Sequence, residues 1–260
     1  MNRPILSILA LSLAIGAGAP KVFAGTGTLE PLAGAQVAPP ADQAYPGEIR
    51  LTVDTSDIDR RIMHVKETIT GVGSDCVLLH GKWEPGWRGP IEASDRVGGL
   101  TISAGGSRLS WARNPVDPHA FLVKMPPGAH TLDLQFDYLA PTTSNVGRTA
   151  LTADALVLQW NEVMLYPAGY FADRIPVDAS VTLPAGWAFA TPLRTATRAG
   201  TRTDFERVSL ELLEDSPIYA GRRWARNDLG AAVPLDLNLF AARPDPIDVQ
   251  PLELERTCCP

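Results

Sequence analysis

The clearest feature of the sequence is a two-residue alternation of hydrophobic and polar side chains. From Leu132 to Tyr138, apolar and aromatic residues alternate with aspartate and glutamine. Successive side chains of a β-strand point to opposite faces, so this pattern predicts a strand with one buried and one solvated face. The same alternation predicts strands in segments 49–54, 63–69 and 175–183.

The segment around residue 66 also predicts how a histidine is oriented. Met63, Val65 and Ile69 fall on one face of this strand, and His64 falls on the other. The apolar face packs into the core, so we expect His64 to point to solvent.

Short apolar runs bounded by turn residues complete the pattern. The pair Gly105–Gly106 predicts a hairpin within 100–109, and residues 209–214 have the pattern of a helical turn. Strands about ten residues apart, joined by proline and glycine turns, predict an all-β fold: an antiparallel β-sandwich or an open β-saddle. The other expected strands are 76–83, 120–125, 187–190, 202–205, 219–226 and 233–240.

The stretch 156–169, LVLQWNEVMLYPAG, combines an apolar run with a polar and aromatic trio. Its length is typical of a strand buried on both faces, although periodicity alone also allows a buried helix. The trio is Gln159, Trp160 and Asn161. A buried amide without a partner costs about 1–3 kcal/mol, so either the fold or a ligand must satisfy these groups.

The N-terminus has the pattern of a secretory signal peptide. Arg3 precedes the apolar run 5–15, and Ala24 is a small residue suited to cleavage. We therefore expect residues 1–24 to be removed and the protein to be periplasmic or secreted.

The rest of the chain divides by its pattern into three parts. Residues 25–44 are rich in glycine, alanine and proline and are expected to be a disordered spacer. The strand pattern occupies 45–243, and 244–260 is expected to be an irregular tail.

Composition agrees with a folded, acidic, exported domain. The chain is 45% hydrophobic, which supports a core, and its 23 prolines and 22 glycines favour short strands joined by turns. Loss of residues 1–24 removes two basic residues and no acidic one, so the net charge goes from -6 to -8. This charge argues against nucleic acids and anionic membranes as partners.

Three cysteines are an odd number for an exported chain. Cys76 lies in an apolar run and is expected to act as a small buried hydrophobe. Cys258 and Cys259 are adjacent in the tail, where they either link chains or are incidental.

The sequence lacks the common hydrolase motifs. None of the four histidines begins a His-Glu-x-x-His motif, and no Gly-x-Ser-x-Gly occurs. We therefore expect no metal site of that type and no catalytic residue. Carboxylate pairs of the glycosidase kind stay open, although solvated surface acids are the default; the acids weighed are Asp95, Asp117 and Glu162.

The segment 83–90 contains two tryptophans, two prolines and two glycines. Trp83 and Trp87 have two alternative interpretations. Their rings plug the open end of a sandwich, or they form a contact surface for a substrate or a neighbouring domain.

Four segments in this order resemble the N-terminal domain of the glycyl aminopeptidase family of zinc metallopeptidases, metallopeptidase family 61. They are 82–86 (KWEPG), 111–117 (WARNPVD), 158–170 (LQWNEVMLYPAGY) and 215–221 (DSPIYAG). The resemblance implies an exported bacterial enzyme with an all-β N-terminal domain, a thermolysin-like catalytic domain with a His-Glu-x-x-His zinc motif, and often a PDZ-like domain.

This resemblance leads to the first functional hypothesis. The chain lacks the zinc motif, so we expect a truncated reading frame, no hydrolytic activity of its own, and zinc only in the missing catalytic domain. The β domain would pack on that domain and wall its cleft. Gln159, Trp160, Asn161 and Tyr166 are the candidates for facing a peptide N-terminus, with the alternative that the trio only holds the fold together.

A second hypothesis is a stand-alone secreted binding module for peptide or carbohydrate. Trp83, Trp87 and Tyr170 would form its ligand platform. Sandwich folds host many unrelated functions, so the fold class alone does not decide between the two.

Overall fold

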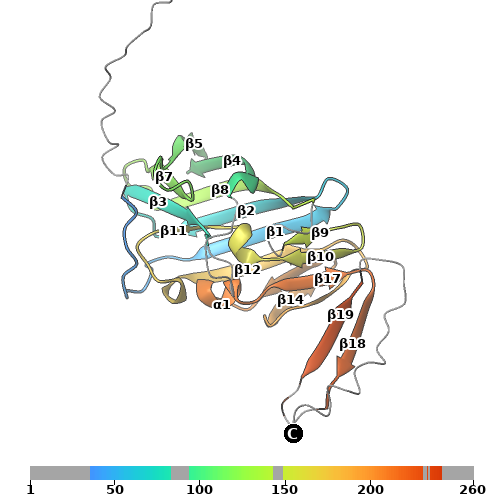
Figure 1. The fold of residues 1–260 in the computed structure, drawn as a ribbon. Coiled ribbons are helices and arrows are strands. Elements are labelled where there is room, and N and C mark those ends of the chain that lie inside the picture. Colours follow the sequence, from blue (N-terminus) through green and yellow to red (C-terminus); the bar gives the residue numbers. More distant parts are fainter. Residues whose placement is uncertain (1–35, 83–93, 143–148, 231–232, 234, 242–260) are drawn as a thin grey trace, which may run out of the picture. The chain divides into compact units, whose positions relative to one another are not determined.

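The structure is a computed structural model that describes residues 36–82, 94–142, 149–230, 233 and 235–241 (Figure 1). The expected signal peptide, most of the expected spacer and the expected tail with its two cysteines lie outside these residues. Trp83 and Trp87 lie outside them as well.

A nine-stranded mixed sheet forms the largest part of the fold. Its strands follow the order β14-β15-β12-β1-β2-β8-β4-β5, and β16 also pairs with β12. The strands are β1 (Ile49–Asp57), β2 (Ile62–Thr70), β4 (Val97–Ala104), β5 (Ser107–Leu109), β8 (Thr131–Leu139), β12 (Pro176–Thr182), β14 (Thr195–Ala199), β15 (Arg202–Phe205) and β16 (Val208–Ser209).

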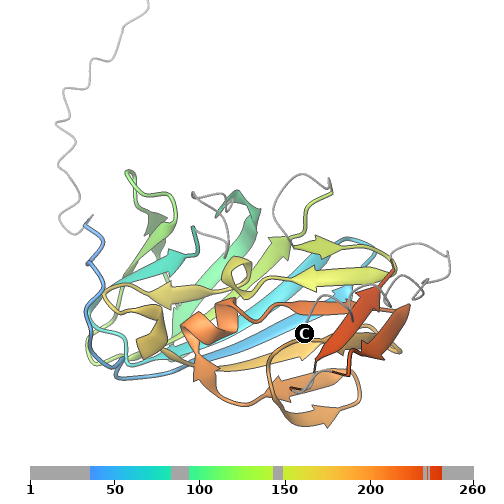
Figure 2. The same ribbon diagram turned by 60° about the horizontal axis from the view of Figure 1, so that its bottom comes forward.

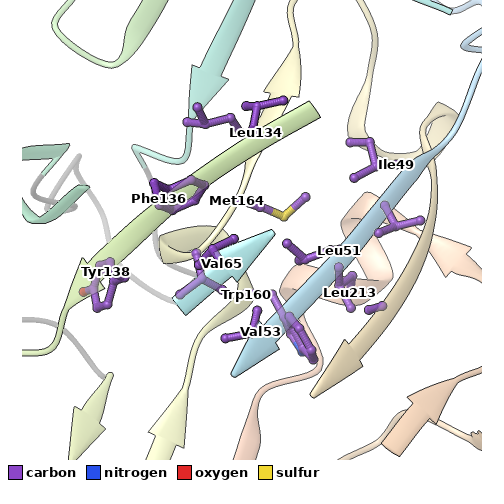
Figure 3. Close-up of a cluster of buried hydrophobic side chains, with 14 of the residues drawn as sticks. Ile49, Leu51, Val53, Val65, Leu134, Phe136, Tyr138, Trp160, Met164 and Leu213 are labelled. Atoms are coloured by element: carbon purple, nitrogen blue, oxygen red, sulfur yellow. The ribbon is translucent and has the colours of Figure 1, made fainter. Parts of the chain in front are cut away.

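The alternating segments of the sequence form the centre of this sheet. Val53 is paired with Val65, and Val65 with Phe136, so the apolar positions of β1, β2 and β8 face the same side. These side chains are buried and pack with Trp160 and Met164 from a smaller layer (Figure 3). The period-two pattern therefore correctly located the core face of the sheet.

One strand pair departs from the expected antiparallel arrangement. β1 and β12 are parallel, with Ile49 opposite Val177. Parallel neighbours need a long crossover connection rather than a tight turn, and here the connection carries most of the domain. Local sequence patterns contain no information about such a distant pairing.

Three smaller sheets accompany the large sheet, and the first two named here cover one of its faces (Figures 1 and 2). One has the order β13-β17-β10-β9, the second β11-β3-β7-β6, and the third is the pair β18-β19. Their strands are β3 (Asp75–His80), β6 (Trp111–Arg113), β7 (Ala120–Lys124), β9 (Ala150–Leu151), β10 (Ala155–Leu158), β11 (Leu165–Pro167), β13 (Ala188–Ala190), β17 (Ile218–Gly221), β18 (Trp224–Asp228) and β19 (Asp236–Phe240).

The stretch 156–169 is not one buried strand, which corrects the sequence prediction. It contributes β10 to one small sheet and β11 to another, and the 3-10 helix η2 (Trp160–Glu162) connects them. The polar residues of the stretch lie at this turn, where the backbone leaves the first sheet. Pro167 and Gly169 end the second strand, as expected.

Other turn predictions are confirmed. Gly105 and Gly106 join β4 to β5, and both have positive φ, 55° and 80°. The expected helical turn is α1 (Leu210–Glu214), which the side chain of Ser209 caps by accepting from the Leu212 N–H. The other 3-10 helices are η1 (Ser94–Arg96) and η3 (Ala172–Arg174).

The last residues of the expected spacer contact the β domain. The Ala41 N–H donates to the Gly169 carbonyl at 3.1 Å, and Arg174 pairs with Asp42 at 2.8 Å. These contacts tie residues 41 and 42 to the region of η3. In the described part of the chain, no helix has the length and apolar character needed to span a bilayer.

Candidate functional site: a buried polar cluster

Polar side chains gather where β3 ends, beside η2 and the turn between β6 and β7. We call this group the polar cluster. It consists of His80, Gly81, Lys82, Asp117, His119, Asn161 and Glu162.

Strand pairing brings these segments together. β3 lies between β7 and β11, with Leu79 opposite Ala120 and His80 opposite Leu165. The His80 N–H donates to the His119 carbonyl at 2.9 Å. Lys82, Asp117 and η2 thus bring residues of three of the four segments that resemble the peptidase family together here. The fourth segment contacts η2 through the Ser216 carbonyl, which accepts from Trp160.

Glu162 is held by side chains from two different sheets. Its carboxylate accepts from the Tyr138 hydroxyl of β8 at 2.7 Å, and its carbonyl lies 3.1 Å from Nε2 of His80. A carbonyl only accepts, so Nε2 of His80 carries the proton. Burial lowers the pKa of His80 to about 4, so the ring is neutral near pH 7.

Glu67 of β2 adds a third contact to the same segment. This side chain is buried, and one carboxyl oxygen accepts from the Leu165 N–H at 3.1 Å. The other oxygen has no partner among the described residues. Burial raises the pKa of Glu67 well above its ordinary value, so the carboxyl is stabilised in its protonated form.

Asn161 is the least satisfied residue of the cluster. It is fully buried, and neither its amide oxygen nor its amide nitrogen has a partner in the described part of the chain. It packs closely on Gly81, where a Cβ atom would stand 3.1 Å from the Asn161 Cβ. Since buried polar groups are normally hydrogen-bonded, an amide without a partner marks Asn161 as the least satisfied position of the cluster.

The other three predicted substrate-facing residues are placed differently. Trp160 is a core residue, because its ring is fully buried and its Nε1–H donates to the Ser216 carbonyl at 2.9 Å. Gln159 is buried, and its Nε2 has no partner among the described residues. Tyr166 is half-buried, and burial raises its pKa to about 12.

An ion pair lies at the edge of the cluster. Lys82 Nζ is 2.5 Å from Asp117, which also accepts from the His119 N–H at 3.1 Å. Partial burial opposes ionisation of Asp117, but the hydrogen bond from Lys82 lowers its pKa overall. The two histidine rings are 6.0 Å apart, and burial lowers the pKa of His119 as well.

The three acids considered as members of a glycosidase-type carboxylate pair each have a different environment. Asp95 is exposed, Asp117 pairs with Lys82, and Glu162 accepts from Tyr138. In the residues that the structure describes, no group of three or more histidine, cysteine or acidic side chains is placed to hold a metal ion. Cys76 is buried, as predicted, and burial raises its pKa to about 12.

The predicted ligand platform is only partly described. Tyr170 is half-buried, and its ring packs edge-on against Tyr45 with centroids 4.9 Å apart. Trp83 and Trp87 lie outside the described residues, so the platform stays a prediction.

Sequence reasoning missed the residues that hold the cluster in place. Glu67 occupies an inward position of the alternation Met63, Val65, Glu67, Ile69. An acid at a core-facing position of a strand is the signal that would have found it. His80 and Tyr138 had no such signal, because their partners come from distant segments.

A model of the peptidase M61 N-terminal domain matches residues 50–222. The chain belongs to this family. The M61 N-terminal domain in this chain contains β3, β6, η2 and α1, and therefore the whole polar cluster. A comparison of the sequence with curated proteins finds no match.

One of the similar solved structures shows the same fold at low identity. An aminopeptidase N family protein from Idiomarina loihiensis is 17% identical, with a TM-score of 0.64 over 74% of this chain and 32% of that chain. An M1 zinc metallopeptidase from Deinococcus radiodurans is 14% identical, with a TM-score of 0.42 over 85% of this chain and 53% of that chain. The part of this chain that matches thus spans about a third of the length of the Idiomarina protein.

Proposed function

We propose that this chain is the non-catalytic β domain of an exported metallo-aminopeptidase-like protein. It packs on a zinc peptidase domain and walls the cleft in which that domain holds a peptide. The family match to a peptidase N-terminal domain and the fold shared with an aminopeptidase N family protein support this proposal. The signal peptide pattern of residues 1–24 supports export.

The observation that carries the proposal is the match of residues 50–222 to a peptidase N-terminal domain. The Asn161 amide is fully buried, so it acts on the cleft only by holding the η2 turn in place. Three contacts from Glu67, Tyr138 and His80 fix the η2–β11 segment that bears Asn161. Such a fixed backbone suits recognition, because little entropy is lost when the ligand binds.

The M61 N-terminal domain would not hydrolyse peptides by itself. The chain has no His-Glu-x-x-His motif, which supplies two zinc ligands and the general base in such enzymes. Zinc in the peptidase domain would activate water there, and the β domain would contribute orientation of the peptide.

The test combines this chain with the peptidase domain of a family member produced without its own N-terminal domain. We expect no hydrolysis of amino-terminal glycine substrates by the chain alone, and a higher kcat/KM of the peptidase domain when the chain is added. Asn161→Ala should raise KM, because the η2–β11 segment beside the cleft loses a packing contact that positions it.

Gln135→Ala is the matched control, since it removes an amide from the exposed face of β8. It should leave KM unchanged. Hydrolysis by the purified chain that resists a chelator would contradict the proposal, as would an Asn161→Ala variant whose KM equals that of Gln135→Ala.

A further inference from the structure

The face of the large sheet that points away from the core carries a polar hollow. Side chains of β1, β2 and β8 that alternate with the core residues point to this face. With residues of β4, β12 and β15 they line a hollow of about 620 Å³, a size that suits a small ligand. Tyr138 of β8 points to the other face, where it contacts Glu162, so the hollow is separate from the polar cluster.

Five charged side chains line the hollow: Asp54, His64, Lys66, Asp137 and Arg202. Three of them have a partner of opposite charge. His64 pairs with Asp137 at 2.7 Å, and Arg202 pairs with Asp204 at 2.7 Å. These pairs leave one acid and one base of the lining to be accounted for.

That acid and that base are Asp54 and Lys66. Asp54 is half-buried, and its carboxylate accepts from the Ser56 N–H at 2.9 Å but has no ion pair with a described residue. Lys66 is exposed, and its ammonium has neither an ion pair nor a hydrogen bond in the described part of the chain. The hollow therefore holds a free negative charge and a free positive charge.

Strand register places these two charges diagonally across β1 and β2. Asp54 is opposite His64, and Lys66, two residues further along β2, is opposite Thr52. Diagonal neighbours on one face of an antiparallel pair are about 7–8 Å apart. Thr182 of β12 lies beside Asp54 in the same way that Thr52 lies beside Lys66, so each charge has a hydroxyl next to it.

We propose that this hollow binds a dipeptide as a zwitterion, with its ammonium group at Asp54 and its carboxylate at Lys66. A ligand that carries both charges satisfies both side chains, whereas a simple anion or cation leaves one of them without a partner. The hydroxyl groups of Thr52 and Thr182 both donate and accept, so they match the peptide group between the two charges. This site goes beyond the proposed function, because it needs no peptidase domain.

The experiment is an NMR titration of the complete chain with diglycine. We expect saturable shifts, with a millimolar Kd, of the backbone amide signals of Thr52, Gly99 and Thr182, which line the hollow. The amide signal of Gly73, which is not part of the lining, should not move. Absence of saturable shifts, or shifts confined to residues outside the hollow, would overturn the inference.

Diglycine with one end blocked tests the two charges separately. N-acetyl-diglycine lacks the ammonium group and diglycinamide lacks the carboxylate, so each should bind about fivefold more weakly, which is the effect of one partly exposed ion pair. Asp54→Asn should abolish the difference between diglycine and its acetylated form. Lys66→Gln should abolish the difference between diglycine and its amide. If the unaltered chain binds all three peptides equally, the inference is wrong.

Two variants with the same changes of charge serve as matched controls. Asp133→Asn removes an acid from the same face of β8 outside the hollow, and Lys124→Gln removes an exposed lysine of β7. Both should bind diglycine as the unaltered chain does. If they weaken binding as much as Asp54→Asn and Lys66→Gln, net charge and not the hollow governs binding, and the inference fails. The proposed function stands in either case, because the peptidase domain is absent from this experiment.

Discussion

At the scale of single residues, the buried carboxyl groups of Glu67 and Glu162 join the large sheet to the η2–β11 segment. Each accepts one hydrogen bond across layers, from the Leu165 N–H and from the Tyr138 hydroxyl. They differ in how well they are paired, since Glu67 keeps one oxygen without a partner among the described residues. Glu67 is therefore the group whose protonation should affect the stability of the fold.

Glu67→Gln should change how the free energy of unfolding depends on pH. The raised pKa means that the folded state keeps a proton which the unfolded state releases above about pH 4.5. Wild-type stability then falls by up to about 1.4 kcal/mol per pH unit, until the pH passes the folded pKa. The glutamine variant cannot titrate, so its stability relative to wild type should increase over this range.

Urea unfolding of both proteins at several pH values measures this difference. Parallel stability curves would mean that Glu67 is ionised in the folded protein. Thr68→Ala is a useful control, because Thr68 lies next to Glu67 on the outward face of β2 and does not titrate.

His64 should produce a smaller pH effect. Its Nδ1 lies 2.7 Å from Asp137 and its Nε2 3.5 Å from Asp57, and the hydrogen bond to Asp137 raises its pKa. Stabilisation is complete below the unfolded pKa of about 6.5 and is lost as the pH rises through the higher folded value.

His64→Gln should therefore lower stability in acid and not in alkali. The ring is 44% exposed, so the loss should be about 0.5 kcal/mol rather than several. The measurement is the free energy of unfolding of both proteins at about one pH unit below and two above 6.5. A loss that is the same at both pH values would show that the imidazole acts only through packing.

At the scale of elements, sequence patterns located strands well where one face is solvated. The alternation of residues 132–138 lies within β8, and Gly105–Gly106 joins β4 to β5. The solvated face of β2 also has His64 on it, as expected. Such patterns succeed because the period of two reports directly on which side of the strand is buried.

The same reasoning failed where no period of two is present. Residues 156–158 and 163–165 are apolar on both sides of the buried turn at η2, so no alternation shows that the chain changes sheets there. Segment 219–226 was expected as one strand, but it divides into β17 and β18. The unpartnered Asn161 amide could be suspected from its type, but its burial depends on Gly81, which is 80 positions away.

Glycine at the start of β1 should be indispensable. A Cβ atom at Gly47 would stand 2.1 Å from the Thr70 carbonyl oxygen, and Gly71 beside it has φ of 76°. Gly47→Ala should therefore separate the ends of β1 and β2 and lower the free energy of unfolding by about 3 kcal/mol. Denaturant unfolding measures the loss.

Gly73→Ala provides the comparison for this element. A Cβ atom at Gly73 meets no other atom within 4 Å, and its φ is not positive. This variant should be as stable as wild type or slightly more so. Equal stability of the two alanine variants would mean that the β1 and β2 ends are not packed as the structure has them.

At the scale of the whole molecule, one distant strand pair closes the large sheet. β12 lies between β1 and β15, and its parallel pairing joins Ile49 to Val177 across about half of the chain. β12 also contributes buried side chains to the core, including Val177 and Val181. The ribbon of β18 and β19 contributes none. Stability should therefore depend on β12 and hardly on the ribbon.

Two truncated chains test this division. A chain that ends at residue 222 keeps the nine-stranded sheet and the core, so it should unfold cooperatively with a urea midpoint close to that of the full chain. A chain that ends at residue 174 lacks β12, which leaves β1 with an open edge and the core uncovered. It should show no cooperative transition in circular dichroism or urea unfolding. If the chain that ends at residue 174 still unfolds cooperatively, β1, β2 and β8 fold without β12. If the chain that ends at residue 222 has a much lower urea midpoint than the full chain, β18 and β19 belong to the cooperative unit.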